Sequence, residues 1–357
     1  MMTRIARTVC KTLLLLGLIE GSARVAEGLR PEVTELTFDY APYRMLRMSK
    51  APWPLNRDGF RARELETYGN SFLIEFLGGS VCLGVGTNPG KTLPERIEGA
   101  LHRAGMRKAQ VLNLCQGGAP SAQELAIFLE YGLPLAPQVV LSFNGANDLM
   151  HPKPVGEDDG PNLPYRNREM QAQFNGHSLL NHLALPRVMA RLARRGADPG
   201  HGLADAVAPE KILRSYIDSL DAVRTLSAAH GALHAVLLQP TLHYRKQWSA
   251  EETAMWKRRR PQDGAEISRY VQRLFEGAEA ALAEWSARTG APVFDLTPAF
   301  QQSRATIYSD SVHFTGEEGY RTIERELEQQ GLIDKIARQY ARWEERTLSA
   351  ASSSWRH

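Results

Sequence analysis

Residues 72–86 read FLIEFLGGSVCLGVG, a short apolar run that ends in two glycines and a serine. An apolar run of this kind, bounded by glycines, is typical of a strand that is buried on both faces of a sheet. The glycines let the chain turn sharply, so Ser80 is expected at the start of a helix that follows the strand directly. The stretch therefore predicts a strand, a tight turn and a helix N-terminus, which together form the repeating unit of parallel α/β sheets.

The same pattern recurs along the chain. The other runs predicted as strands are Ala109–Leu114, Gln138–Phe143, Leu233–Leu238 and Pro292–Asp295, with helical patterns between them, for example Leu93–Ala104 and Ala122–Tyr131. Strands that alternate with helices predict an α/β fold, here a parallel five-stranded sheet between two layers of helices. Because ligands bind at the carboxyl ends of the strands in such sheets, the residues that follow each strand are the candidates for a site.

Length and composition limit the class of protein. The chain has 357 residues, of which 43% are hydrophobic and 23% charged, and its net charge is +3. This is enough for one large α/β domain with insertions. The basic residues are dispersed apart from short runs such as Lys257 to Arg260, so no nucleic-acid partner is expected. No group of Cys and His residues has the spacing of metal ligands, and no metal is expected.

The chain has three cysteines, Cys10, Cys82 and Cys115. Cys10 lies in the N-terminal leader, and the other two fall in segments that we expect to lie close together. Two interpretations stay open for Cys82 and Cys115. They form a disulfide if the protein is exported, or they are two unpaired, buried apolar side chains, which is the interpretation we favour.

Residues 1–26 have the pattern of a signal peptide or a membrane-anchoring leader. Arg4, Arg7 and Lys11 precede an apolar run, LLLLGLI at 13–19, and charged residues follow soon afterwards. The run is too short for a membrane-spanning helix without burying charge. We expect an exported protein, either periplasmic or anchored to the membrane and facing the periplasm. The alternative is a cytoplasmic protein with a short amphipathic helix packed on the domain.

The remaining organisation is read from composition. The expected parts are an extended N-terminal arm at 27–70, a main domain at 71–345 with insertions at 151–209 and 241–263, and a disordered tail at 346–357. Both insertions follow strand ends, so we expect them to overhang the candidate site.

Several polar residues at strand ends suit nucleophilic catalysis. A serine hydroxyl is a weak nucleophile that needs a base within hydrogen-bond reach, a group that orients the base, and donors for the oxyanion. Asp310 and His313 lie three residues apart in YSDSVHFTGEEGY, while Gly118 and Asn147 follow the second and third predicted strands. Each motif alone also suits an ordinary turn or helix cap. Their joint placement at one sheet edge predicts that Ser80 is a nucleophile.

The ordered blocks resemble the SGNH hydrolase superfamily, also called the GDSL esterase/lipase family. They read Gly78-Gly79-Ser80, Gly118, Gly145-Ala146-Asn147-Asp148 and Asp310-Ser311-Val312-His313, and the resemblance covers roughly residues 56–330. The arm sequence LNRDGFRARELE also resembles a bacterial subgroup with a GGS nucleophile block and a membrane-targeting leader.

This resemblance implies a flavodoxin-like α/β/α domain without a cofactor. It implies that Ser80 attacks the acyl carbon, that His313 acts as general base and then general acid, and that Asp310 orients His313. The implied oxyanion hole consists of the Ser80 N–H, the Gly118 N–H and the Asn147 side chain.

Two positions depart from the family pattern. Gly79 stands where well-known members have Asp, and we expect this to loosen the support around the serine. Phe314 follows the histidine where Pro is common, which we expect to be tolerated. Among other candidates, His151 is a weaker alternative base, and His243 and Trp248 are candidates for substrate contact. A solvent-facing loop residue is the plainer interpretation of His243, whereas for Trp248 a lid anchor is as plausible as substrate contact.

The expected activity is a serine esterase or deacylase. It would remove an O-acyl group, most often acetyl, from a glycan, a lipid or a small molecule through an acyl-enzyme. One alternative is an O-acyltransferase that uses the same triad with a glycan hydroxyl as acceptor. Another is a catalytically idle glycan-binding module on the same fold. The oligomeric state stays open.

Overall fold

The centre of the molecule is a five-stranded parallel sheet. The computed structural model describes residues 2–28, 37–41, 44–69, 71–150, 208–259 and 264–354. The strands of the sheet are β3 (Phe72–Gly78), β4 (Ala109–Asn113), β5 (Val139–Asn144), β6 (Leu233–Leu238) and β7 (Val293–Asp295). Each strand matches its predicted apolar run to within one residue at either end. Fully buried apolar runs therefore identified the strands correctly.

The strand order is β4-β3-β5-β6-β7. Counted along the chain within this sheet, the order is second, first, third, fourth and fifth, which is the flavodoxin-like arrangement. The topological switch point, where ligands bind in open α/β sheets, therefore lies between β3 and β5. Ser80 follows β3 and Asn147 follows β5, so both residues lie at this switch point.

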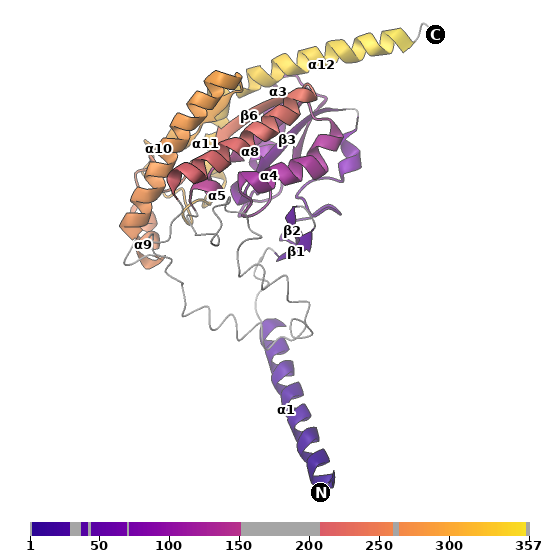
Figure 1. The fold of residues 1–357 in the computed structure, drawn as a ribbon, viewed down its shortest axis with the longest axis vertical. Coiled ribbons are helices and arrows are strands. Elements are labelled where there is room, and N and C mark those ends of the chain that lie inside the picture. The colour runs from indigo at the N-terminus through magenta and orange to yellow at the C-terminus, as the bar shows by residue number, and fades with distance from the viewer. Residues whose placement is uncertain are drawn as a thin grey trace.

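Helices cover both faces of the sheet, as Figure 1 shows. Along β3, Phe72, Ile74 and Phe76 pack into the core on one face, and Leu73 and Leu77 pack into the core on the other. The first face is covered by α3 (Leu93–Arg103), α11 (Glu317–Gln329) and α12 (Leu332–Ser354), and the second by α4 (Ser121–Ile127), α8 (Pro209–Ala229) and α10 (Gly264–Thr289). The predicted three-layer α/β/α architecture is confirmed.

Short helices complete the domain and position the site. They are α2 (Ser80–Leu83), η2 (Phe128–Gly132), η3 (Leu133–Leu135), α5 (Ala146–Leu149), α9 (Ala250–Arg259) and η7 (Thr297–Phe300). The helices α2 and α5 start one or two residues after β3 and β5, at the carboxyl edge of the sheet. The residues of the candidate site are therefore held on short elements that continue directly from the strands.

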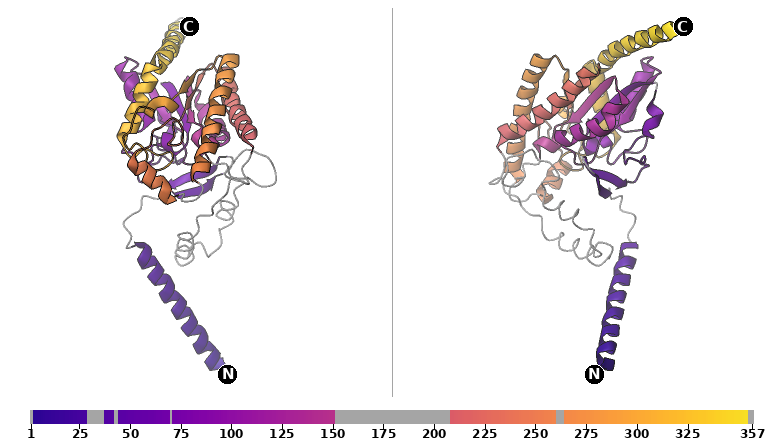
Figure 2. Two further views of the ribbon diagram at one scale, coloured as in Figure 1. Left: turned by 90° about the vertical axis from the view of Figure 1, so that its left-hand side faces the viewer. Right: turned by 45° about the vertical axis from the view of Figure 1, so that its right-hand side comes forward.

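The N-terminal part forms a long helix and a small hairpin. The helix α1 (Met2–Gly28) projects away from the α/β domain in Figure 2 and exposes Leu14, Leu15 and Leu18. Among the described helices, none has a long enough apolar stretch to cross a bilayer. The expected arm is more ordered than the sequence suggested. It contains the antiparallel pair β1 (Thr37–Ala41) and β2 (Met45–Lys50), followed by η1 (Leu65–Tyr68).

Two further expectations concern segments outside the sheet. The predicted disordered tail at 346–357 is wrong over most of its length, because α12 continues to Ser354. On this helix the Thr347 hydroxyl donates to the Trp343 carbonyl at 2.8 Å. The insertion at 151–209 falls almost entirely outside the described residues, and so does His151. The second insertion is described as far as Arg259 and forms α9.

Candidate active site

The structure brings Ser80, His313 and Asp310 into one hydrogen-bonded line. The Ser80 Oγ lies 2.7 Å from His313 Nε2, and His313 Nδ1 lies 2.7 Å from Asp310 Oδ2. Ser80 and His313 are 233 residues apart in the chain, so only the tertiary fold joins them. This is the geometry in which a base activates a serine hydroxyl while a carboxylate orients the base.

The acid and the base share one tight loop. Tyr308 pairs with Phe314 across this loop, and the Thr315 N–H donates to the Ile307 carbonyl at 2.7 Å. Within the loop, Asp310 Oδ1 accepts the N–H groups of Val312 and His313, each at 2.8 Å. One carboxylate oxygen therefore orders the loop, and the other is left to orient the imidazole.

Asp310 is held in its ionised form. Partial burial alone would raise the pKa of the Asp310 carboxyl, but the hydrogen bond and charge of His313, with the two backbone N–H donors, lower it to about 2. A carboxylate that accepts several hydrogen bonds is stabilised as the anion. Asp310 is therefore negatively charged at any pH near neutrality and can stabilise a protonated His313.

Donors for an oxyanion gather beside Ser80. Within the described chain, neither the Ser80 N–H nor the Gly118 N–H has a hydrogen-bond acceptor. Gly118 has a φ of 75°, a conformation that favours glycine. The Asn147 Nδ2 donates to the Ala119 carbonyl at 2.8 Å, which leaves its second N–H free to donate elsewhere. Three candidate donors, from α2, α5 and the loop of Gly118, are thus available for one negative charge.

The need for a glycine at position 79 comes from the space around it and not from its backbone conformation. Its φ of −87° suits any residue, but a β-carbon at this position would lie 2.2 Å from Asn147 Nδ2 and 3.8 Å from the Ala119 carbonyl oxygen. The Asn147 amide therefore fills the place of a side chain at residue 79. We expected the missing Asp to loosen the support of the serine, yet here the glycine gives the amide its room.

Asp148, in α5, connects the two segments that carry the candidate oxyanion donors Gly118 and Asn147. Its carboxylate accepts the Ser121 hydroxyl at 2.7 Å and the Ser121 N–H at 3.1 Å, at the first turn of α4. Burial raises the pKa of Asp148 to about 6, although the hydrogen bonds from Ser121 act in the opposite direction. Since Ser121 follows Gly118 closely and Asp148 follows Asn147, this pair ties the two donors together.

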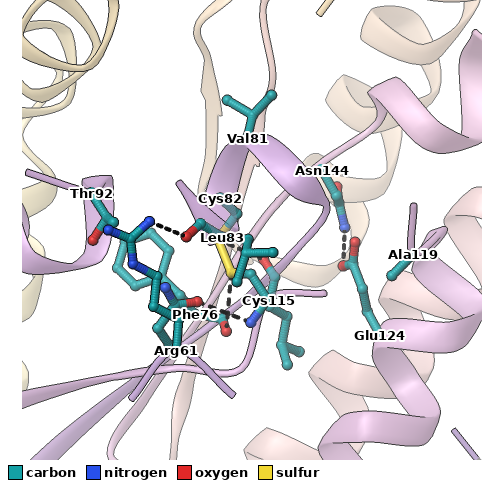
Figure 3. The surroundings of a disulfide bond; sticks show 12 residues. Arg61, Phe76, Val81, Cys82, Leu83, Thr92, Cys115, Ala119, Glu124 and Asn144 are labelled. Carbon is teal, nitrogen blue, oxygen red and sulfur yellow. Dashed lines mark hydrogen bonds between the residues drawn. A yellow bond between two sulfur atoms is a disulfide. The ribbon is translucent and has the colours of Figure 1, made fainter. Parts of the chain in front are cut away.

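A second buried chain of hydrogen bonds lies next to this pair. The Asn144 side chain, at the end of β5, donates to Glu124 at 2.7 Å and accepts from the Tyr216 hydroxyl at 2.9 Å. Burial, aided by the charge of Asp148, raises the pKa of Glu124 well above its ordinary value. Asn144 and Glu124 are drawn in Figure 3. These hydrogen bonds link α4, β5 and α8 next to the candidate site.

Comparison with known proteins gives solved structures of low similarity. No family model and no curated protein matches the sequence. A GDSL-like lipase from Bacteroides thetaiotaomicron has 15% identity and a TM-score of 0.40, over 74% of this chain and 89% of its own. An acetyl xylan esterase has 14% identity and a TM-score of 0.41, over 72% and 98%. An acetyl-xylooligosaccharide esterase from Geobacillus, in a mutant form, has 13% identity and a TM-score of 0.43, over 71% and 91%. Values this low do not assign an activity to this chain.

Cys82 and Cys115 form a disulfide, shown in Figure 3, with their Cα atoms 5.7 Å apart. The favoured interpretation of two unpaired cysteines is therefore wrong. Cys82 lies in α2 two residues after Ser80, and Cys115 lies three residues before Gly118. Both are fully buried. The disulfide joins the helix of Ser80 to the loop of the candidate oxyanion donor Gly118. The spacing of the cysteines along the sequence could not decide whether they pair.

The segment 241–259 supports the loop of Asp310 and His313. Glu252 Oε1 accepts the N–H groups of Ile307 and Tyr308 at 2.9 and 3.0 Å, and its other oxygen lies 3.2 Å from Lys246 Nζ in a buried ion pair. Sequence reasoning missed Glu252, although the capping signal Ser249-x-x-Glu252 is visible and present in the structure. This anchoring holds α9 in place beside the loop of Asp310 and His313.

His243 is buried, so the interpretation as a solvent-facing loop histidine is wrong, and its contact with substrate stays a prediction. Its side chain is buried beside Ser268, Trp248 and Trp256, with its Nδ1 3.0 Å from the Ser268 hydroxyl. Burial lowers the pKa of His243 to about 4, so the ring is neutral near pH 7. Trp248 is half-buried, packs against the main core and donates to the Leu242 carbonyl at 2.6 Å. Both residues pack in the described structure, and the substrate contact predicted for Trp248 also stays a prediction.

No metal site accompanies the triad in the part of the chain that the structure describes. There, no three His, Cys, Asp or Glu side chains lie close enough together to hold an ion.

Proposed function

We propose that this chain is a serine hydrolase that cleaves O-acyl esters through Ser80, His313 and Asp310. The observation that carries the proposal is the line from Ser80 Oγ to His313 Nε2 to Asp310 Oδ2, with both distances at 2.7 Å. The unpaired N–H groups of Ser80 and Gly118 support it, because a nucleophile without an oxyanion site would leave the charge of the intermediate unstabilised.

The proposed reaction has two halves. His313 takes the Ser80 proton as Ser80 Oγ attacks the ester carbonyl, and the oxyanion forms beside Ser80 N–H, Gly118 N–H and Asn147. His313 then gives the proton to the departing alcohol, which leaves an acyl-serine. In the second half, His313 deprotonates a water that attacks the acyl-serine, and the carboxylic acid departs as Ser80 regains its proton.

The proposed substrate is an O-acetyl or other short acyl ester of a glycan, lipid or small molecule. A glycan is the first class to test, since two of the similar solved structures are esterases of acetylated xylan or xylooligosaccharides. The domain at 71–345 would carry the whole reaction, because every proposed reacting group lies within it.

The test is hydrolysis of a chromogenic acetyl ester by the wild type and by Ser80→Ala, combined with labelling by a fluorophosphonate probe. We expect the wild type to turn over the ester and to be labelled, and Ser80→Ala to do neither. Equal hydrolysis by both proteins, with neither labelled, would contradict the proposal.

The same assay separates hydrolysis from acyl transfer. With an acetyl donor, a glycan acceptor and water present together, free acetate is the product of a hydrolase and an acetylated glycan is the product of a transferase. An intact triad that yields neither, with any of the donors tested, would indicate an idle binding module.

We also propose that the protein works outside the cytoplasm. The basic and apolar order of α1 supports export, and so does the Cys82–Cys115 disulfide, because disulfides persist in oxidising compartments. A C-terminal reporter that is active only in the periplasm tests this. We expect activity from the wild type and its loss when Leu14, Leu15 and Leu16 are replaced by Glu.

A further inference from the structure

A tight turn in the N-terminal arm places Arg61 against the end of α2, the helix that begins with Ser80. Asn56 Oδ1 accepts the N–H groups of Asp58 and Phe60 at 3.1 and 2.9 Å. Gly59 has a φ of +82°, and a β-carbon there would lie 2.4 Å from the Met48 carbonyl oxygen, so the turn needs glycine. The turn places Phe60 fully inside the core and leaves the next residue, Arg61, facing the end of α2.

Arg61 binds the backbone where α2 ends, as Figure 3 shows beside Leu83. Its Nη1 donates to the Gly84 carbonyl at 2.7 Å and to the Leu83 carbonyl at 3.4 Å. Its Nη2 donates to the Thr87 carbonyl at 3.1 Å, and its guanidinium lies 4.3 Å from the centre of the Trp53 ring. The fork of donors therefore binds three carbonyl groups, those of Leu83, Gly84 and Thr87, just after the nucleophile helix.

This charge is buried without an ion pair. Arg61 is 9% exposed, and none of the described carboxylates lies within ion-pair distance of it. Burial lowers its pKa, while the nearby charge of Glu95 acts in the opposite direction. Backbone carbonyls and the Trp53 ring supply its contacts instead. Burying a charged side chain without a carboxylate partner costs free energy. A role in shaping the α2 turn therefore explains the burial of Arg61 better than a role in solubility does.

Hydrogen bonds within the α2 turn connect the residue that Arg61 binds, Gly84, to Ser80. The Ser80 carbonyl accepts the N–H groups of Gly84 and Val85 at 3.2 and 3.1 Å, which closes the segment into one unit. Arg61 also packs closely against Gly84, because a β-carbon on Gly84 would lie 3.0 Å from Arg61 Nη1. We propose that Arg61, from the arm outside the sheet, is a positioning residue that sets the Ser80 nucleophile for His313. This inference rests on the proposed function.

The experiment compares Arg61→Gln, Arg61→Lys and Arg61→Ala with a matched control, Arg63→Gln. Arg63 lies in the same arm, is 51% exposed and stacks on Tyr68. The measurements are kcat and KM on a chromogenic acetyl ester, the rate of Ser80 labelling by a fluorophosphonate, and thermal unfolding. The labelling rate reports the nucleophile itself and needs no knowledge of the natural substrate.

We expect Arg61→Gln to lower kcat and the labelling rate by at least about tenfold while KM stays within about twofold, because small misplacements of a reacting group cost rate rather than binding. Arg61→Lys should be intermediate, Arg63→Gln unchanged, and millimolar methylguanidinium should restore part of the labelling rate of Arg61→Ala. Folded Arg61 variants that label and turn over like the wild type overturn the inference.

Two other results are also decisive. If Arg61→Gln and Arg61→Lys both fail to fold where Arg63→Gln folds, Arg61 serves fold stability and the positioning role is overturned. A wild-type protein that is neither labelled nor active overturns the proposed function, and this inference with it.

Discussion

The side-chain amide of Asn147 occupies the space that a β-carbon on Gly79 would need, with only 2.2 Å between Nδ2 and that ideal β-carbon position. The residue before the proposed nucleophile and a proposed oxyanion donor therefore pack tightly against each other. Since Asn147 Nδ2 is also bonded to the Ala119 carbonyl, the amide cannot move aside without breaking that bond.

Replacing Gly79 by Ala should displace the Asn147 amide and lower kcat. We expect a loss of at least about tenfold for Gly79→Ala and roughly 10²–10³-fold for Asn147→Ala, the usual effect of removing one oxyanion donor. The double variant should lose little more than Asn147→Ala alone, because both changes remove the same donor. Gly69→Ala is the control, since a β-carbon there meets only the Glu66 carbonyl oxygen at 3.8 Å. Additive losses of kcat in the double variant would contradict the view that Gly79 acts by making room for the Asn147 amide.

Asp310→Asn should lower kcat by several orders of magnitude. An amide can present its N–H group to His313 Nδ1, which would favour the imidazole tautomer that cannot accept the Ser80 proton. Asp334→Asn, an exposed position on α12, is the control. Turnover of Asp310→Asn near that of the wild type would mean that the serine and histidine work without their orienting group.

Asp148 should make folding stability depend on pH. Its folded pKa of about 6 lies above the ordinary value of 3.8, so the folded state holds this proton more tightly than the unfolded chain does. Its contribution to the free energy of unfolding is therefore fully present below about pH 4 and is lost as the pH rises toward about 6, by on the order of 1–3 kcal/mol. Urea unfolding of the wild type and Asp148→Asn at several pH values measures it. A difference between the two proteins that stays constant from pH 4 to pH 7 would argue against this.

Removing the disulfide should destabilise the domain. Cys82 and Cys115 are separated by 33 residues, and closing a loop of that length stabilises a protein by roughly 2–4 kcal/mol. We expect the double variant Cys82→Ala and Cys115→Ala to melt several degrees lower than the wild type. A thiol reductant present during unfolding should lower the wild-type Tm and leave that of the double variant unchanged. A wild-type Tm that is insensitive to the reductant, with two free thiols counted after denaturation, would show that the bond does not form.

Much of the fold could be read from local patterns. Runs such as FLIEFL are too apolar to face water on either side, so they are expected as buried strands, and their spacing leaves room for at least one helix between neighbours. The hairpin β1–β2 and the helical continuation of α12 were not foreseen, because neither has a strong apolar period and both depend on contacts or propensities that a short window does not resolve.

The sequence by itself determined the α/β class, because its buried apolar runs alternate with helical patterns. It also predicted five site residues, since Ser80, Gly118 and Asn147 follow predicted strands, and Asp310 and His313 lie three residues apart near the end of the domain. Only the tertiary structure decided what surrounds them, namely the pairing of Cys82 with Cys115, the fit of Asn147 over Gly79, and the contact of Arg61 with the α2 turn. The physical reason is that these are contacts between segments whose separation in space depends on how the layers pack. Strand periodicity carries no information about that packing.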